Sequence, residues 1–330
     1  MTAFLIILGA FALLSSFLLL WQWVAAQRFP LHQEIALPAF TPGVTILKPL
    51  KGCDATTAAS LETWLVQEYA GPVQILFGVA DAADPVVAVV RGLLAAHPER
   101  NARLIICGPL QGVNAKVAKL AQLEALAQHE NILIADADVR VPRNFLHNFV
   151  APLAEPQCGL VNSFYRLANP VTNAMRWEAI AINADFWSQV LQSQMLKPLD
   201  FALGATILIR RQVLAEMGGF RALADCLADD YQLGHRTAQK GHTIALCPTV
   251  VECWDAPMGW RQVWKHQLRW ARTIRVCQPV PYFFSILSNA GFWPMIWLLA
   301  ALATGPHLCQ ALTAVALLLI RTALAQSLQR

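Results

Sequence analysis

The stretch Ile132-Leu-Ile-Ala-Asp-Ala-Asp138 sets the architecture of the central part of the chain. Four apolar residues in a row are typical of a strand that is buried on both faces, and two carboxylates follow at once. The same order, a short apolar run followed by a longer helical stretch, recurs between residues 42 and 280. This alternation predicts an α/β sheet whose parallel strands are joined by helical crossovers and covered on both faces.

The expected strands span residues 44–47, 73–79, 103–107, 132–135 and 159–162, and the expected helices span 57–67, 85–96, 115–128 and 142–153. In such sheets ligands bind beyond the carboxyl ends of the strands, where loops converge and helix N-termini point inward. The residues that directly follow each strand are therefore the candidates for chemistry.

Three acidic pairs occupy positions of this kind. They are Asp81 with Asp84, Asp136 with Asp138, and Asp229 with Asp230. An Asp-Xaa-Asp pair at a strand end brings two carboxylates together, and a divalent cation such as Mg²⁺ or Mn²⁺ relieves their repulsion while leaving positions for phosphate oxygens. Such a cation holds a diphosphate and neutralises it as it leaves. The sequence has neither a Gly-Xaa-Gly-Xaa-Xaa-Gly motif nor a Walker-type lysine loop, so phosphates must be handled in another way.

A structural role competes with this interpretation, because Asp at a strand-to-helix junction often only caps the helix. For Asp81, Asp84 or Asp229 alone, the two interpretations are equally good. For Asp136 together with Asp138 we favour metal binding. One carboxylate of the third pair can cap the following helix while the other faces the cleft as a general base.

The two ends of the chain are apolar, and the charged fraction of the whole is only 14%. Residues 3–26 carry no charge and are long enough to cross a bilayer as a helix, with Trp21 and Trp23 at the headgroup layer. A signal peptide would need basic residues before the apolar stretch, whereas the first positive charge, Arg28, follows it. We expect residues 1–28 to be a transmembrane anchor, with Met1 outside and the residues after Arg28 in the cytoplasm.

The C-terminal part, residues 281–330, is expected to contain one or two membrane segments. Residues 281–305 are uncharged and can span, whereas the run 308–320 is marginal in length and could instead be re-entrant or interfacial. Three crossings in total would return Arg321 and Arg330 to the cytoplasm. This predicts an integral protein of the inner, cytoplasmic membrane if the source is bacterial.

Residues 256–280 are expected to form a basic amphipathic helix on the membrane surface. Its basic residues recur at steps of four, four, three and three and therefore share one stripe: Arg261, Lys265, Arg269, Arg272 and Arg275. Attraction to anionic lipids, about 1 kcal/mol per basic residue, would explain this charge. It would not explain why Trp270 directly follows Arg269, so a second role is expected: Arg269 or a neighbour stabilises a departing diphosphate and Trp270 packs beside the acceptor.

Several of these motifs occur together in one known family, in the same order. They are Leu47-Lys-Pro-Leu-Lys-Gly52, Asp81 to Pro85, Gly112-Val-Asn-Ala-Lys116, Asp136-Ala-Asp138, Gly204-Ala-Thr-Ile, Ala228-Asp-Asp-Tyr231 and Arg269-Trp270. On these residues the chain resembles the ceramide glucosyltransferases, which are inverting enzymes with a GT-A domain, a Rossmann-like fold that binds nucleotide sugars. It is also similar to bacterial glycosyltransferases of hopanoid biosynthesis.

The resemblance implies a GT-A domain over residues 42–255 and a role for each matching position. Asp81 and Asp84 would contact the uridine and ribose of a UDP-sugar. Lys116 would lie near the diphosphate, and Asp138 would be the metal ligand with Asp136 beside it.

The same resemblance implies that Asp230 is the catalytic base and that Arg269 and Trp270 belong to a Gln/Arg-Xaa-Xaa-Arg-Trp element. His266 stands where that element usually has Gln or Arg, and it could still donate a hydrogen bond to the diphosphate. Animal members have Gly where Asp138 stands, so the metal ligand differs within the family.

The favoured function is transfer of glucose from UDP-glucose to a ceramide-like lipid, with inversion. Transfer of N-acetylglucosamine to a hopanoid polyol is the nearest alternative, because the sequence barely separates lipid acceptors. A processive polysaccharide synthase ranks third, since three short crossings offer little wall for a polymer channel. A membrane scaffold whose aspartates only cap helices and a metal-dependent phosphohydrolase stay open as other classes. No nucleic-acid partner is expected.

Overall fold

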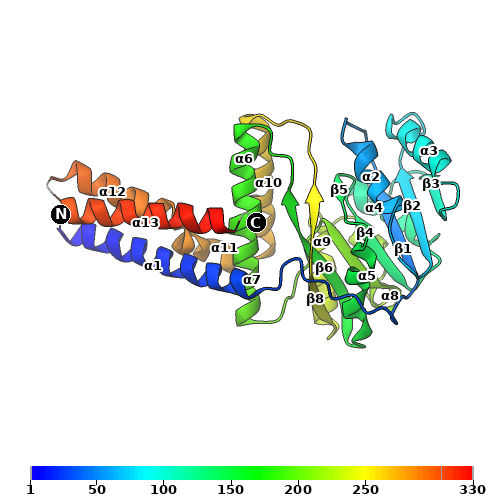
Figure 1. Cartoon of the computed structure of the whole chain (residues 1–330), viewed down its shortest axis with the longest axis horizontal. Helices are drawn as coiled ribbons and strands as arrows, with labels where there is room; N and C mark the ends of the chain where they lie inside the picture. The colour runs from blue at the N-terminus through cyan, green and yellow to red at the C-terminus, as the bar shows by residue number, and fades with distance from the viewer. Residues whose placement is uncertain (1, 306, 329–330) are drawn as a thin grey trace. The chain divides into compact units, whose positions relative to one another are not determined.

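One mixed sheet of eight strands organises the larger of two compact units, Pro30–Met175 with Pro198–Gly259 (Figure 1). The structure is a computed structural model that describes residues 2–305 and 307–328. The strands are β1 (Val44–Pro49), β2 (Val73–Val79), β3 (Ala102–Ile106), β4 (Asn131–Ala135), β5 (Val139–Arg140), β6 (Cys158–Leu167), β7 (Thr206–Arg210) and β8 (Thr243–Cys253). Their order in the sheet is β3-β2-β1-β4-β7-β6-β8-β5.

The first half of the sheet confirms the predicted parallel arrangement. Strands β3, β2, β1 and β4 are parallel neighbours, and each coincides with an expected strand to within two residues at either end. The expectation of parallel strands is wrong for β7, which is antiparallel to both β4 and β6. Because β7 runs in the opposite direction, it begins where β4 ends, with Thr206 opposite Ala135. The loop before β7 therefore reaches the edge of the sheet that carries Asp136.

Helices cover both faces of this sheet (Figure 1). They are α2 (Thr57–Leu65), α3 (Val86–Ala96), α4 (Ala115–Glu124), α5 (Phe145–Val150), α8 (Arg211–Glu216) and α9 (Asp229–Gln239), with the short 3₁₀ helices η1 (Ala151–Ala154) and η3 (Phe220–Leu223). The core contains apolar side chains of α2, α3 and α5, packed against strands that are buried over most of their length. Trp64 and Phe145 meet edge to face at its centre. The strand ends therefore extend from a densely packed core.

The smaller unit, Met1–Phe29 with Arg176–Lys197 and Trp260–Arg330, is entirely helical where it is described. Its elements are α1 (Thr2–Arg28), α6 (Asn173–Ile180), the π-helix η2 (Ala181–Phe186), α7 (Trp187–Leu196), α10 (Trp260–Cys277), α11 (Pro279–Phe284), the 3₁₀ helix η4 (Ser285–Ser288), α12 (Phe292–Ala303) and α13 (Leu308–Ser327). Leu5, Leu8 and Ala12 of α1 pack with Trp297 and Ala314 in a small core. A Cβ at Gly9 would lie 2.9 Å from the ring of Trp297, so the close approach of α1 and α12 needs a glycine there.

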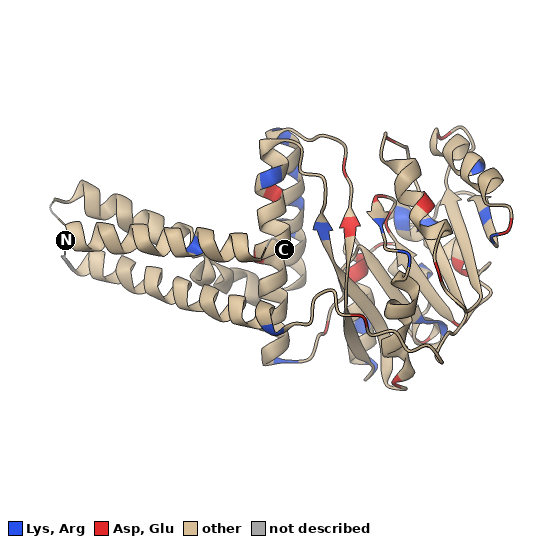
Figure 2. Ribbon diagram, viewed as in Figure 1, with Lys and Arg blue, Asp and Glu red and all other residues tan. Residues whose placement is uncertain are grey.

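Two helices, α1 and α13, are each long and apolar enough to cross a membrane. Figure 2 shows that these helices and α12 carry almost no charged residues. A third candidate is the bent pair of residues 279–288 and 292–303, whose two parts meet at 45°. The break has a local cause, because the Asn289 side chain accepts the amides of Gly291 and Phe292 and so starts a new helix.

The form of the two C-terminal segments differs from the expectation, although one or two spans there still agree with their length and composition. Residues 281–305, expected to span, are broken, whereas the run 308–320, expected to be marginal, extends to Ser327 as one helix of 20 residues. The polar residues after Ile320 continue the helix, and Arg321 is held there by Asp185 through two 2.6 Å contacts.

Candidate functional site

Lys116 connects the acidic residues at the end of β4 with those at the start of α9. Its Nζ lies 2.7 Å from Asp136 Oδ1 and 3.5 Å from Asp229 Oδ2. Asp136 is fixed in turn by its amide, which donates to the carbonyl of Ala205 at 3.2 Å, just before β7. Two of the three acidic pairs that the sequence singled out therefore meet at one edge of the sheet.

Asn114 supports this arrangement. As the N-cap of α4, its side-chain oxygen accepts the amides of Lys116 and Val117 and so fixes the first turn of the helix. Its amide nitrogen donates to Asp229 Oδ1 at 3.3 Å and to the carbonyl of Cys226 at 2.8 Å. The sequence pattern gave Asn114 no role, although it stands in the Gly112-Val-Asn-Ala-Lys116 motif beside Lys116.

Asp230 lies next to Asp229 in the first turn of α9, close to the backbone before β7. A Cβ at Gly204 would come within 2.5 Å of Asp230 Oδ2, so only glycine leaves room for this carboxylate. Burial raises the pKa of Asp230 to about 6, and the negative charges of Asp229 and Asp136 add to the rise, while Lys116 opposes it. A carboxylate with a pKa near 6 is ionised at neutral pH and accepts a proton more readily than an ordinary aspartate.

Asp138 is the second carboxylate of this site whose pKa is raised. Burial raises its pKa to about 6, with further rises from the charges of Asp136 and Asp255. Repulsion between partly buried carboxylates is the condition that a bound cation relieves. The described residues contain no group of three or more His, Cys, Asp or Glu side chains that would enclose a metal. The carboxylates of Asp136 and Asp138 are donors of the kind that fits Mg²⁺ or Mn²⁺, which often shares one or two carboxylates with substrate phosphates.

Lys48 on β1 is a site residue that the sequence pattern did not single out. The side chain is fully buried, and Nζ donates to the carbonyl of Asp136 and lies 4.6 Å from the centre of the Trp64 ring. Burial lowers the pKa of Lys48 to about 7, although Asp138 and Asp136 counteract this. A lysine inside an otherwise buried strand is rare unless it is paired, and its place in Leu47-Lys-Pro was the available signal.

Tyr165 and Cys253, at the ends of β6 and β8, also belong to this region. Burial raises the pKa of each well above its ordinary value, and the charges of Asp136 and Asp138 raise both further. Both groups therefore stay protonated and neutral at the edge of the carboxylate cluster. Nothing in the sequence distinguished them, because β8 was not predicted.

Asp81 and Asp84 form a separate loop between β2 and α3. Both oxygens of Asp84 accept the amide of Gly52, at 3.0 and 2.9 Å, and Oδ1 also accepts the amide of Val86 at the start of α3. Asp81 is exposed and accepts the amide of Ala83 at 2.8 Å. Asp84 thus has a structural role, because it accepts the amides of Gly52 and Val86. Contacts of Asp81 and Asp84 with uridine and ribose stay a prediction.

The remaining predicted residues lie on α10 in the smaller unit. The five basic residues of the stripe are exposed, and so are the large apolar residues Trp260, Trp264, Leu268 and Ile274. His266 and Trp270 are partly buried, and their ring centroids are 4.4 Å apart. Residues Trp260–Cys277 form one helix, while its place at a membrane surface and the roles of His266, Arg269 and Trp270 toward a diphosphate stay predictions.

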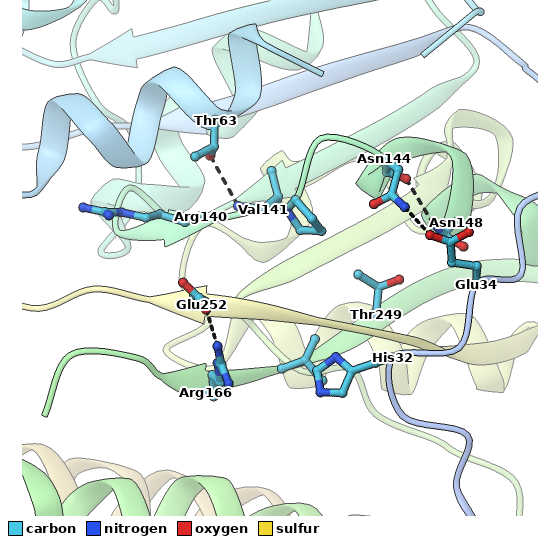
Figure 3. Close-up of a pocket in the computed structure, with 12 residues that line it drawn as sticks. His32, Glu34, Thr63, Arg140, Val141, Asn144, Asn148, Arg166, Thr249 and Glu252 are labelled. Carbon is cyan, nitrogen blue, oxygen red and sulfur yellow. Dashed lines mark hydrogen bonds and ion pairs between the residues drawn. The ribbon is translucent and has the colours of Figure 1, made fainter. Parts of the chain in front are cut away.

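A cavity of about 430 Å³ in the larger unit is distinct from the carboxylate cluster (Figure 3). Arg140, Arg166 and Glu252 line it, and Arg166 pairs with Glu252 at 2.5 Å. Side chains alternate between the two faces of a strand, so Glu252 points away from the face that presents its neighbour Cys253 to the carboxylates. None of the predicted site residues lies among those that line this cavity.

The mixed sheet, with paired carboxylates and lysines at one edge, is the GT-A fold of the glycosyltransferases. The chain matches glycosyl transferase family 21 over residues 4–330 and belongs to that family. The same fold occurs in the mannosyltransferase PcManGT from Pyrobaculum calidifontis, solved in complex with GDP-Man and Mn²⁺. The TM-score is 0.62 at 23% identity, covering 98% of this chain and 92% of that one.

Curated relatives carry the name expected from the sequence motifs. Ceramide glucosyltransferase 1 of Caenorhabditis elegans is 23% identical over 228 residues, which are 66% of this chain and 47% of the relative. Ceramide glucosyltransferase of Candida albicans is 31% identical over 122 residues, 34% of this chain and 22% of the relative. The chain spans about half the length of the nematode relatives that it matches. The predicted resemblance to the ceramide glucosyltransferases is confirmed.

Proposed function

We propose that this chain transfers a sugar, with glucose as the first choice, from a UDP-sugar to the hydroxyl of a ceramide-like membrane lipid, with inversion. The observation that carries the proposal is the cluster in which Lys116 joins Asp136 to Asp229, beside Asp138 and Asp230. Membership of glycosyl transferase family 21 and the names of the curated relatives support sugar transfer as the reaction class.

Asp230 is the general base of the proposed reaction, a single displacement at the anomeric carbon. Asp230 takes the proton of the lipid hydroxyl while that oxygen forms a bond to the anomeric carbon. The bond from the anomeric carbon to the diphosphate breaks in the same displacement, UDP leaves, and the configuration inverts. A pKa of about 6 keeps Asp230 ionised at neutral pH and able to accept this proton.

The leaving diphosphate carries the developing negative charge. Lys116, and by the sequence resemblance His266, Arg269 and Trp270, would bind or border it, and such electrostatic stabilisation is often the largest contribution to catalysis. Mg²⁺ or Mn²⁺ at Asp138, with Asp136 beside it, would supply further positive charge to the phosphates when bound. Asp81 and Asp84 would hold the uridine and ribose.

The acceptor is proposed to be a lipid because the chain has helices suited to a membrane. Helices α1 and α13 are long and apolar enough to span, and α10 exposes basic residues together with Trp260 and Trp264. We infer that α10 lies at the membrane surface and that the larger unit faces the cytoplasm, since the first apolar helix ends with Arg28.

The test is transfer by the purified full-length chain in lipid nanodiscs. UDP-glucose and UDP-N-acetylglucosamine are each supplied with ceramide or a hopanoid polyol, with Mn²⁺ or with EDTA, and products are identified by mass spectrometry. We expect β-glucosylceramide with Mn²⁺ and little product with EDTA. A glycosylated hopanoid as the product would show that the acceptor is a hopanoid and not ceramide. Release of phosphate without any glycolipid would show that the chain is a hydrolase and not a transferase.

A further inference from the structure

Glu178 on α6 is a fully buried carboxylate in the smaller unit. Its side chain is 1% exposed. Burying an ionised carboxylate costs several kcal/mol unless strong donors compensate it. Neighbouring groups must therefore compensate the cost of burying the Glu178 carboxylate.

Those neighbours are two consecutive residues of α10. His266 Nδ1 lies 2.7 Å from Glu178 Oε1, and Gln267 Nε2 donates to the same oxygen at 3.0 Å. Within the described part of the chain, neither the other oxygen, Oε2, nor His266 Nδ1 has an aligned hydrogen-bond partner, so the contact of Nδ1 with Oε1 is an ion-pair contact. The interactions that hold this carboxylate are thus concentrated on one oxygen and come from one helix.

The short contact fixes the state of the His266 ring. At 2.7 Å this contact is attractive only if Nδ1 carries a proton, because an unprotonated ring nitrogen and a carboxylate oxygen would repel each other. With Nδ1 committed to Glu178, only Nε2 is left to interact with another group. A partner on the second nitrogen is the usual way in which proteins fix the tautomer and orientation of a functional histidine.

The same ring contacts Trp270. The centroids of His266 and Trp270 are 4.4 Å apart with the planes inclined by 56°, one helical turn along α10. Holding His266 therefore also restricts the Trp270 ring. The His266 side chain is 24% exposed and Trp270 is only partly buried, so a ligand can reach both rings.

We propose that Glu178 is a positioning residue, which holds Nδ1 of His266 so that Nε2 and the Trp270 ring are presented together. The inference deepens the proposed function, since the use of Nε2 toward a diphosphate rests on that function. The positioning itself depends only on the contacts between α6 and α10.

The first test reads the ring directly. The full-length chain, labelled with ¹⁵N-histidine and placed in lipid bilayers, is examined by NMR, and the His266 signals are those lost in His266→Gln. We expect a protonated Nδ1, and we expect Glu178→Gln, which keeps the side-chain volume, to shift both ring nitrogens. Asp185→Asn is the matched control, because Asp185 lies just after α6 and its ion pair is with Arg321 instead.

An unprotonated Nδ1 in the unaltered chain would overturn the inference. It would also be overturned if Glu178→Gln shifted the His266 signals no more than Asp185→Asn does. A folding defect alone would move the signals of many of the eight histidines, not those of His266 selectively.

The second test measures transfer from UDP-glucose to ceramide in a double-mutant cycle. By analogy with the outer partners of metal-binding histidines, Glu178→Gln should lower kcat about tenfold. In the His266→Gln background it should cause no further loss, whereas a purely structural role would reduce the rate in both backgrounds. Suppose that neither the unaltered chain nor any variant transfers glucose, while the His266 signals still respond to Glu178→Gln and not to Asp185→Asn. In that case the proposed function fails and the positioning role stands.

Discussion

Two loops of the larger unit have similar sequence patterns but different environments. Each follows a buried parallel strand and contains two aspartates, Asp81 with Asp84 after β2 and Asp136 with Asp138 after β4. Asp84 accepts backbone amides with both oxygens, so the loop itself accounts for that carboxylate. Asp138 instead has a raised pKa near other negative charges. Carboxylates that the fold does not satisfy are the better candidates for chemistry.

The largest expected effect is a loss of kcat that distinguishes the base Asp230 from the capping residue Asp84. Asp230→Asn removes the proton acceptor, so kcat should fall by roughly 10²- to 10⁴-fold, the usual contribution of general base catalysis. Binding of UDP should persist, because the amide keeps the size of the side chain. Asp84→Asn should mainly raise KM for the donor, since it leaves the reacting atoms untouched.

Initial rates at varied UDP-glucose and calorimetric titration with UDP measure both quantities. A variant Asp230→Asn with unchanged kcat would exclude Asp230 as the base. An Asp84→Asn variant with as large a loss in kcat would remove the contrast between Asp84 and Asp230.

The second effect tests the space around Asp230. In Gly204→Ala the new Cβ would meet Asp230 Oδ2 at 2.5 Å, so the carboxylate must move. A displacement of about 1 Å at a catalytic group can cost roughly 100-fold in rate, and we expect a loss of that order in kcat. Gly92→Ala is the matched control, because Gly92 lies in α3 after the Asp84 loop and a Cβ there meets nothing within 4 Å.

Rates and thermal unfolding are measured for both glycine variants. We expect Gly92→Ala to keep its activity and to gain stability from the better helix former. Equal activity in the two variants would mean that the position of Asp230 is unimportant.

The third effect is the pH dependence of transfer. Asp230 must be ionised to accept a proton, and burial raises its pKa to about 6. Below that pH the rate constant kcat/KM should fall about tenfold per unit, while between pH 7 and 8 it should be nearly constant. The residual rate of Asp230→Asn should lack this step. A profile that stays flat from pH 5 to 8, with the fold intact by circular dichroism, would contradict the assignment.

Local periodicity was enough to predict the first half of the sheet and its parallel order. The antiparallel strand β7 could not be predicted in this way, because a five-residue apolar run such as Thr206–Arg210 carries no sign of its direction. Its direction comes from pairing with β4, which is a tertiary contact. The consequence for the site is large, since this reversal brings Gly204 beside Asp230.

The site was predictable where residue types are unusual and hidden where they are ordinary. Paired aspartates after a strand indicated Asp136 and Asp138 from the sequence. Tyr165 and Cys253 are common residues on long strands, and only their burial near those aspartates distinguishes them. Glu178 gave no signal either, because α6 was not predicted and its burial depends on packing against α10.

The smallest expected effect concerns stability, and it has opposite signs at Asp230 and at Asp84. The raised pKa of Asp230 means that its ionised form is disfavoured in the fold; the penalty is full above about pH 6 and vanishes as the pH falls below the ordinary value of 3.8. At pH 8 without metal, Asp230→Asn should therefore stabilise the chain, by on the order of 1 kcal/mol after allowance for solvent. Asp84→Ala, which removes a helix cap, should cost about 0.5–2 kcal/mol at the same pH.

Thermal unfolding of the purified variants in one detergent, with EDTA present, measures the difference. Lowering the pH to 5 should shrink the advantage of Asp230→Asn, because the unaltered Asp230 carboxylate then becomes neutral in the fold. The loss in Asp84→Ala should remain at pH 5, since the carboxylate still accepts the amides of Gly52 and Val86. Destabilisation by both substitutions at pH 8 would show that Asp230 is held by the fold as Asp84 is, and the contrast that points to chemistry at the β4 edge would be lost.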